Sequence, residues 1–278
     1  MRGKIAVRRL LRCVVHNERA PSFTIHGRGR WLSLALRAVV FDYGMVLSGP
    51  PDPRAHNELV RRVGLPAAEF DALYWADRHA FDEGKLTGEE FWRNLLQKAG
   101  VAALPALVAE LLAWDARMWM TLNPAMLAWQ GLLQARGLRT AVLSNLGDAT
   151  QQAMERELPW LKRFDALVWS YQERIAKPDP AIYRITLDRL GARPDETLFL
   201  DDRPENVAAA AALGIQALVF TTADALGAQL VARGLDKQLP LPDAPRHAQP
   251  SASLLHSPAP EICAFLAAMR AQPAGDKQ

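Results

Sequence analysis

The stretch FDYGMVLS, residues 41–48, ends an apolar run of the chain and places a carboxylate, Asp42, where that run stops. The residues from Ala38 to Phe41 are uncharged and apolar, which is typical of a short strand buried on both faces of a parallel sheet. Gly44 follows two residues after the carboxylate and interrupts the pattern. The stretch therefore predicts a buried strand that ends on an aspartate. The side chain of this aspartate is expected to be exposed and held in one orientation.

Four more apolar runs of similar length follow along the chain. The predicted strands are residues 37–42, 140–145, 166–170, 197–202 and 216–220. Helix-period segments such as 124–136 and 180–190 lie between most of them. Strands that alternate with helices indicate right-handed crossovers and a parallel sheet covered on both faces. We therefore predict an α/β fold with a doubly wound, Rossmann-like core.

The interval between the first two strands differs from the rest of the chain. Segments 55–63, 67–78, 88–99 and 104–118 show helix periodicity, and glycines and prolines separate them. We predict a core domain at 37–52 and 123–235 with an all-helical insertion at 53–122. Residues 1–36 are predicted to be a basic, disordered leader, and residues 236–278 a flexible tail rich in proline and alanine.

The charge distribution argues against a nucleic-acid-binding protein. The net charge is +3, but residues 1–36 alone carry eight basic residues and one acidic residue. The remaining 25 basic and 29 acidic residues sum to −4, so the predicted folded body is mildly acidic. The leader loosely resembles a transit peptide, but a disordered extension or an upstream start codon is favoured over that interpretation.

The remaining composition favours a soluble globular protein with a packed core. Half of the 278 residues are hydrophobic, and no apolar run approaches the roughly 18 residues of a membrane span. Cys13 and Cys263 are the only cysteines, too few for a disulfide framework or a thiolate metal site. We predict a cytoplasmic protein with neither a nucleic-acid nor a membrane partner, and we predict no particular oligomeric state.

Polar side chains gather where the predicted strands end, which is where open parallel sheets bind ligands. Carboxylates that gather with few cations repel one another, and a divalent ion relieves the repulsion. Oxygen ligands without histidine or cysteine favour Mg²⁺, and an ammonium and a hydroxyl beside the ion suit a phosphate. The strand ends therefore predict phosphoryl transfer. The residues concerned are Asp42, Ser144, Asn145, Lys177, Asp201 and Asp202.

Four segments of the chain, in order, resemble the motifs of the haloacid dehalogenase-like (HAD) superfamily. They read VVFDYGMVL, AVLSN, IAKPDPAIY and LFLDDRPENV, and the resemblance covers about residues 37–222. The helical insertion resembles the C1 cap of this superfamily. The cap segment YWADRHAFDEGKLTGEEFW is similar to that of the subfamily that contains the dehalogenases and the small-molecule phosphatases.

The resemblance implies a role for each matched residue. Asp42 is expected to be the nucleophile that takes up the phosphoryl group, and Lys177 to neutralise the charge that Asp42 and the phosphate share. Ser144 and the backbone at Asn145 are expected to hold phosphoryl oxygens. The expected Mg²⁺ ligands are Asp42, the carbonyl of Gly44, Asp201 and Asp202, and Asn206 is expected to support them from behind.

Gly44 departs from the pattern of the superfamily. Most of its phosphatases have an aspartate at this position that acts as general acid and base, and losing such a group costs about 10²–10⁴-fold in rate. One explanation is a substrate whose leaving group needs little protonation, such as an anomeric sugar phosphate or an acyl phosphate. Another is a cap residue that completes the site, with Asp77, Arg78 or His79 as candidates. The third is a weak or inactive relative that binds rather than cleaves.

From these observations we predict a Mg²⁺-dependent phosphatase that acts on a small soluble phosphomonoester, with the first two explanations of Gly44 favoured. Arg78 and His79 are the substrate-binding candidates in the cap, whereas Trp75 is favoured as a core residue of the cap helices. The alternatives are a metal-independent haloacid dehalogenase, and a binding or regulatory protein that keeps the fold. Metal-dependent phosphate release distinguishes the phosphatase from both alternatives.

Overall fold

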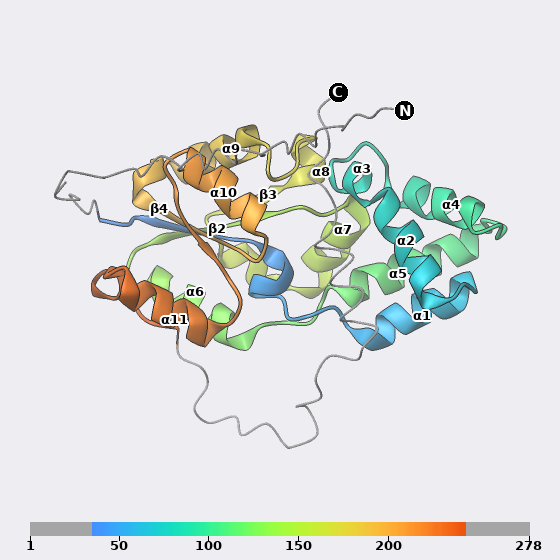
Figure 1. Ribbon diagram of the computed structural model, residues 1–278, viewed down its shortest axis with the longest axis horizontal. Coiled ribbons are helices and arrows are strands. Elements are labelled where there is room, and N and C mark those ends of the chain that lie inside the picture. The colour runs from blue at the N-terminus through green and yellow to red at the C-terminus, as the bar shows by residue number, and fades with distance from the viewer. Residues whose placement is uncertain (1–34, 243–278) are drawn as a thin grey trace, which may run out of the picture. The chain divides into compact units, whose positions relative to one another are not determined.

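The fold is built on a five-stranded parallel sheet, as predicted (Figure 1). In the computed structural model, which describes residues 35–242, the strand order is β3-β2-β1-β4-β5. Each observed strand lies within one residue of its predicted ends, because near-continuous apolar runs mark strands that are covered on both faces. The strands are β1 (Ala38–Phe41), β2 (Arg139–Ser144), β3 (Ala166–Trp169), β4 (Thr197–Asp201) and β5 (Gln216–Val219).

The central strand β1 sends alternate side chains to the two faces of the sheet. Val39 and Phe41 pack into one hydrophobic cluster, and Ala38 and Val40 pack into another on the opposite face. All four are at most 3% exposed, and this explains why β1 is apolar at every position. Residues Ala38 to Phe41 pair in register with β2 on one side and with β4 on the other.

Eleven helices and four short turns connect these strands in the described residues. The helices are α1 (Pro53–Val63), α2 (Ala67–Ala76), α3 (Arg78–Asp82), α4 (Gly88–Lys98), α5 (Pro105–Met118), α6 (Pro124–Ala135), α7 (Asp148–Glu157), α8 (Ser170–Glu173), α9 (Pro180–Leu190), α10 (Pro204–Ala212) and α11 (Ala223–Ala232). The turns are η1 (Tyr43–Leu47), η2 (Pro159–Arg163), η3 (Pro194–Glu196) and η4 (Leu235–Lys237).

Helices cover both faces of the sheet, which makes the fold doubly wound (Figure 1). Helices α9 and α10 lie on one face, where Ile182, Tyr183 and Ala210 pack against the strands. Helices α6 and α11 lie on the other face, where Trp129 and Leu230 share a cluster with β1. The carboxyl ends of the strands therefore form the edge at which loops and helix starts meet.

Helices α1 to α5 occupy the interval that was predicted to be a helical insertion, and they have a hydrophobic cluster of their own. Aromatic rings dominate this cluster, with Phe70 stacked near both Tyr74 and Trp92. The predicted helix at 67–78 is divided in the structure, because the backbone of Asp77 leaves the helical conformation between α2 and α3.

Several contacts join the insertion to the sheet domain, and two of them involve the helix that follows β2 and the loop before it. Helix α5 packs along α7, and the end of α3 packs against the loop after β2. In that loop a side chain on Gly147 would collide with the ring of Phe81, so the absence of a Cβ lets α3 approach. This contact brings the end of α3 to the carboxyl edge of the sheet.

The ends of the described chain differ from the sequence prediction. Leu36, placed in the disordered leader, is buried, and its N–H donates to Gln238 Oε1 at 2.8 Å. Residues 236–242, predicted to start the flexible tail, instead pack on the core. There Leu239 is fully buried, and Trp129 Nε1 donates to Pro240 O at 2.7 Å. Residues 1–34 and 243–278, with the rest of the predicted leader and tail and both cysteines, lie outside the described residues.

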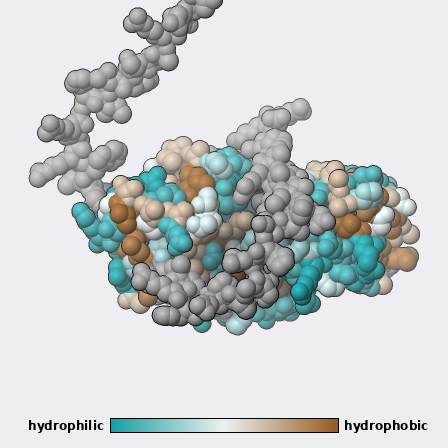
Figure 2. Space-filling view, turned by 60° about the horizontal axis from the view of Figure 1, so that its bottom comes forward, coloured by the Kyte–Doolittle hydropathy of each residue, from teal (hydrophilic) through white to brown (hydrophobic). Residues whose placement is uncertain are grey.

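The surface of the described part is mixed in polarity. In Figure 2, apolar residues lie in small groups between hydrophilic ones wherever the described residues are visible. The large apolar side chains that are most exposed are Leu104, Leu122, Leu132, Val231 and Leu241, which come from separate segments. Within residues 35–242, no helix has the length and apolar character that crossing a membrane requires.

Candidate active site

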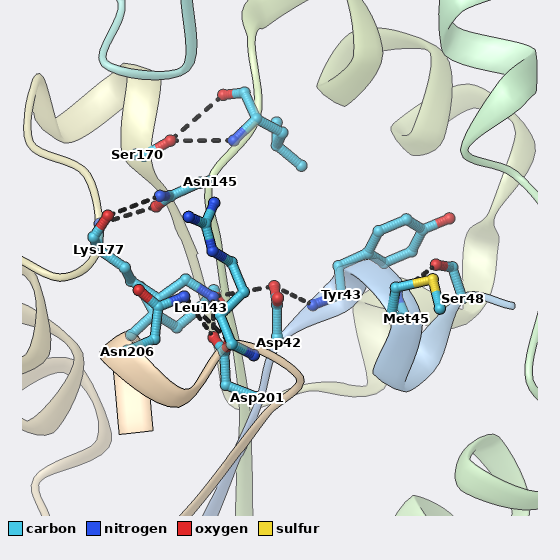
Figure 3. Close-up of polar contacts among 12 residues, drawn as sticks. Asp42, Tyr43, Met45, Ser48, Leu143, Asn145, Ser170, Lys177, Asp201 and Asn206 are labelled. Atoms are coloured by element: carbon cyan, nitrogen blue, oxygen red, sulfur yellow. Dashed lines mark hydrogen bonds and ion pairs between the residues drawn. The ribbon is translucent and has the colours of Figure 1, made fainter. Parts of the chain in front are cut away.

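Polar residues from three adjacent strands meet at the carboxyl edge of the sheet (Figure 3). Asp42 follows β1 directly, Ser144 ends β2 and Asp201 ends β4. Lys177, from the loop before α9, reaches the same place. The parallel order β2-β1-β4 produces this convergence, since neighbouring strands end at the same edge. Asp42, Ser144 and Lys177 line one cavity, together with Gly44 and Asp202.

The turn after β1 fixes the direction of Asp42. The N–H of Asp42 donates to Leu200 O at 2.8 Å, and its Oδ1 accepts from the Tyr43 N–H at 2.6 Å. Gly44 has an extended backbone, and Met45 then adopts the left-handed conformation at φ 61°. That conformation is unfavourable for methionine, and a hydrogen bond from the Met45 N–H to Ser48 Oγ at 3.0 Å stabilises it. Asp42 therefore points to the cavity from a tightly held turn.

Lys177 connects two of the carboxylates. Its Nζ lies 3.0 Å from Asp42 Oδ1 and 2.6 Å from Asp201 Oδ2, and it donates to Leu143 O at 2.9 Å. Burial alone lowers the pKa of Lys177, but the charges of Asp201 and Asp42 outweigh burial and raise that pKa above its usual value. The ammonium therefore stays charged beside the predicted nucleophile.

Asn145 holds the loop that carries Lys177. Its side-chain Nδ2 donates to Lys177 O at 2.9 Å, and its Oδ1 accepts from the Lys177 N–H at 2.8 Å. Both ends of the amide are thus bonded to the backbone of one residue (Figure 3). The side chain of Asn145 is committed to positioning Lys177, which leaves its backbone as the group that faces a ligand.

Asp201 is enclosed by donors. It is fully buried, and Lys177 Nζ, the Arg203 N–H and Asn206 Nδ2 all donate to it. Burial, with a smaller contribution from the charge of Asp42, raises the pKa of Asp201 to about 6 in spite of Lys177. Asn206 Nδ2 donates to both oxygens of Asp201, at 3.0 and 3.1 Å, so it holds this carboxylate in place.

Three carboxylates are close enough to share a metal ion. One oxygen each of Asp42, Asp201 and Asp202 lie within 4.8 Å of one another. Asp202 lines the cavity, whereas Asp201 lies beneath it against Lys177. Oxygen ligands of this type fit a hard divalent cation such as Mg²⁺. The donor set therefore fits the predicted ion.

The helical insertion supplies the opposite wall of the cavity. Arg78, a substrate-binding candidate from the sequence, lines this cavity, but its guanidinium is already paired. Its Nε donates to Asp82 Oδ1 at 2.9 Å, and its Nη1 lies 3.6 Å from Asp115. His79 is not part of the lining. Its side chain is 40% exposed and lies 3.3 Å from Glu83, so nothing in its position makes it a substrate contact.

Sequence reasoning missed other parts of this wall. Trp75, which was expected to be a core residue of the cap helices, is 7% exposed and also lines the cavity. Trp119 and Asp82 line it too. The Tyr43 hydroxyl of the sheet domain donates to Trp119 O of the helical insertion at 2.9 Å. Trp75 and Asp82 lie within the quoted cap segment, but the resemblance implies no site role for them, and Trp119 lies outside that segment. The docking of α2, α3 and α5 brings these residues to the sheet edge.

The chain is similar in sequence to known proteins. A family model described as haloacid dehalogenase-like hydrolase matches residues 36–214. Acyl-CoA dehydrogenase family member 10 of Mus musculus is 33% identical over 204 residues, which cover 69% of this chain and 18% of that protein. Phosphoglycolate phosphatase of Rhodospirillum rubrum is 35% identical over 98 residues, covering 35% of this chain and 41% of that protein.

A solved structure shows the same fold. The HAD family enzyme bt-2542 of Bacteroides thetaiotaomicron, in its magnesium complex, aligns with a TM-score of 0.57 at 22% identity, covering 67% of this chain and 94% of that one. The chain spans less than half the length of the two curated relatives described above.

Proposed function

This chain belongs to the haloacid dehalogenase-like hydrolases, and from that premise we propose that it is a Mg²⁺-dependent hydrolase of a small phosphomonoester. The observation that supports this proposal most is the buried Lys177 ammonium between Asp42 and Asp201, beside a third carboxylate at Asp202. Three carboxylates and one ammonium suit a doubly charged phosphate that binds together with a divalent cation.

Asp42 is the proposed nucleophile. One of its oxygens attacks phosphorus in line with the bond to the leaving alcohol, which gives an aspartyl phosphate that water then hydrolyses. Its hydrogen bond from the Tyr43 N–H holds the carboxylate in one orientation, so little freedom is lost on reaction. Lys177 stays charged and stabilises the negative charge that grows on the phosphoryl oxygens.

The proposed Mg²⁺ ligands are Asp42, Asp202 and the backbone carbonyl of Gly44, with Asp201 beside them. When bound, the ion supplies positive charge that neutralises the phosphate and orients it for attack. Asp201 makes its contacts with Lys177 and Asn206, so its main proposed task is to hold that lysine in place. Ser144 and the backbone at Asn145 donate to the remaining phosphoryl oxygens.

Helices α1 to α5, within residues 53–122, form the proposed cap over the site. Trp75, Trp119 and Arg78 form its wall of the cavity, which suits a small substrate. The similarity of the chain to a phosphoglycolate phosphatase supports a phosphoester as the substrate class.

Two other functions remain as alternatives. A haloacid dehalogenase uses the same aspartate but needs no metal, and the three clustered carboxylates argue against it. A binding protein without turnover is the second alternative, and Gly44 is the residue that favours it because a glycine cannot transfer a proton.

Magnesium affinity is expected to rise with pH. A bound ion favours the ionised form of Asp201, whose pKa is raised to about 6 in the metal-free protein. At pH 5, Asp201 is therefore protonated in most molecules, and metal binding must release that proton. At pH 7, Asp201 is already ionised in most molecules. Isothermal titration calorimetry should show about tenfold tighter Mg²⁺ binding at pH 7 than at pH 5, with nearly one proton released at pH 5.

The matched variant for this measurement is Asp201→Asn, which removes the titrating group and keeps the size of the side chain. It is expected to bind Mg²⁺ more weakly and with little dependence on pH between 5 and 7. A wild-type affinity that stays constant over this range would show that Asp201 does not compete with the ion for a proton.

A further inference from the structure

A leaving group that takes up a proton as it departs needs a donor elsewhere in the cavity, because Gly44 has no side chain to supply one. Asp42, Asp202 and Lys177 already have tasks at the phosphoryl group. Of the candidates named from the sequence, Asp77 pairs with Lys98 at 2.6 Å and His79 with Glu83, and neither lines the cavity. The remaining titratable groups on the cavity wall are therefore the candidates for the proton donor.

Four such groups line the cavity, and three of them are unsuited to acid catalysis. Burial raises the pKa of Tyr43 far above its usual value, and the Tyr43 hydroxyl already donates to Trp119 O. Arg78 and Arg203 are guanidinium groups, which do not release protons in proteins. Within residues 35–242, this leaves Asp82 as the carboxyl group on the cavity wall that has no metal-binding task.

The position of Asp82 is fixed from the sheet domain. Its backbone carbonyl accepts a hydrogen bond from Ser170 Oγ, and the same Oγ accepts from the Leu146 N–H at 3.0 Å. Leu146 lies two residues after Ser144, so one hydroxyl joins the end of α3 to the proposed phosphate-binding loop. The packing of Phe81 on Gly147 holds the same end of α3 in place.

The surroundings of Asp82 favour the protonated form of its carboxyl group more than water does. Burial raises the pKa of Asp82, and the charge of Asp115 adds to this effect, while Arg78 and His79 oppose it. Arg78 Nε donates to Oδ1 of Asp82, which leaves Oδ2 to carry the proton. Its side chain is 15% exposed, so the group is largely shielded from water yet reaches the cavity.

We propose that Asp82 is the general acid and base of this enzyme, supplied by the cap in place of the side chain that Gly44 lacks. The inference rests on the proposed phosphatase function. As the bond from Asp42 to phosphorus forms and the bond to the leaving oxygen breaks, the Asp82 proton moves to that oxygen and the alcohol departs. In the second step water attacks phosphorus and gives its proton to Asp82, and the bond to Asp42 breaks to release phosphate.

The test compares two phosphomonoesters that differ in how much the leaving group needs a proton. An alkyl phosphate needs protonation, whereas p-nitrophenyl phosphate leaves as a stable phenolate. Asp82→Asn is expected to lose about 10²–10³-fold in kcat/KM on the alkyl phosphate and less than about tenfold on p-nitrophenyl phosphate. Asp82→Glu, which keeps a carboxyl group, should recover part of the alkyl phosphate activity.

Asp115→Asn is the matched control. Asp115 is also a buried partner of Arg78, but it does not line the cavity, so its replacement should change the ratio of the two activities much less than Asp82→Asn does. A second readout needs only the wild type. The ratio of kcat/KM for the alkyl phosphate to that for p-nitrophenyl phosphate should fall as pH rises, because Asp82 loses its proton.

The results distinguish a failure of the proposed role of Asp82 from a failure of the proposed phosphatase function. Equal losses on both substrates in Asp82→Asn, or a wild-type ratio that does not change with pH, would show that Asp82 serves only as a partner of Arg78. Wild-type protein that releases no phosphate from p-nitrophenyl phosphate in Mg²⁺ would overturn the proposed phosphatase function itself, and the inference with it. If Asp82→Asn still hydrolyses p-nitrophenyl phosphate but not the alkyl phosphate, the result supports both the phosphatase function and the proposed role of Asp82.

Discussion

The Asp42→Asn variant is expected to lose phosphate release by roughly 10³-fold or more in kcat. An amide oxygen carries no full negative charge, so it cannot form the aspartyl phosphate on which both steps depend. The amide can still accept the hydrogen bond from the Tyr43 N–H, so the turn after β1 should persist. The measurement is steady-state phosphate release in Mg²⁺, with thermal unfolding recorded for both proteins.

Asp52→Asn is the matched control for this experiment. Asp52 caps the start of α1 through its side chain, and asparagine caps a helix about as well as aspartate does. The same chemical change outside the cavity should therefore leave turnover and stability nearly unchanged. An Asp42→Asn protein that is folded and turns over within tenfold of wild type would remove Asp42 from the role of nucleophile.

The Lys177→Met variant is expected to lose both activity and stability. Removing the ammonium leaves Asp42 and the fully buried Asp201 facing each other without their cation. Breaking a buried pair of this kind costs about 3–5 kcal/mol of the free energy of unfolding. Loss of the stabilising charge at the phosphoryl group should lower kcat by about 10²–10³-fold. Chemical denaturation and phosphate release measure the two effects.

A double variant separates these effects. In Lys177→Met with Asp201→Asn, the buried negative charge is gone, so most of the lost stability should return. The activity should not return, because no cation faces the phosphate from that side. If Lys177→Met alone is as stable as the wild type, the ammonium does not stabilise the buried carboxylates as its contacts indicate.

The sheet could be predicted closely from the sequence because each strand is covered on both faces. Val39 and Phe41 must be apolar for one face, and Ala38 and Val40 for the other, so burial leaves a continuous signal. Helix α7 was not predicted, because it is largely polar. Its buried side chains include Thr150 and Gln151, which give little apolar periodicity.

The candidate site likewise has parts that could be predicted from the sequence and parts that could not. Asp42, Ser144 and Asp201 were predictable because the strand order places their strand ends together. Their detailed tasks were not, since the burial of Asp201 beneath the cavity and the double hydrogen bond of Asn145 to Lys177 depend on tertiary packing. Asp82 could not be found from the sequence, because the docking of α3 on Gly147 brings it to the site.

The most direct test of the proposed function is product release by the wild-type protein in Mg²⁺ and in excess chelator. Sugar phosphates, acyl phosphates, nucleotides and p-nitrophenyl phosphate would be tested for phosphate release, and 2-haloacids for halide release. We predict phosphate release that requires Mg²⁺, and no halide release. Halide release that persists in chelator, or a folded protein that binds Mg²⁺ but releases neither product, would contradict the proposed phosphatase.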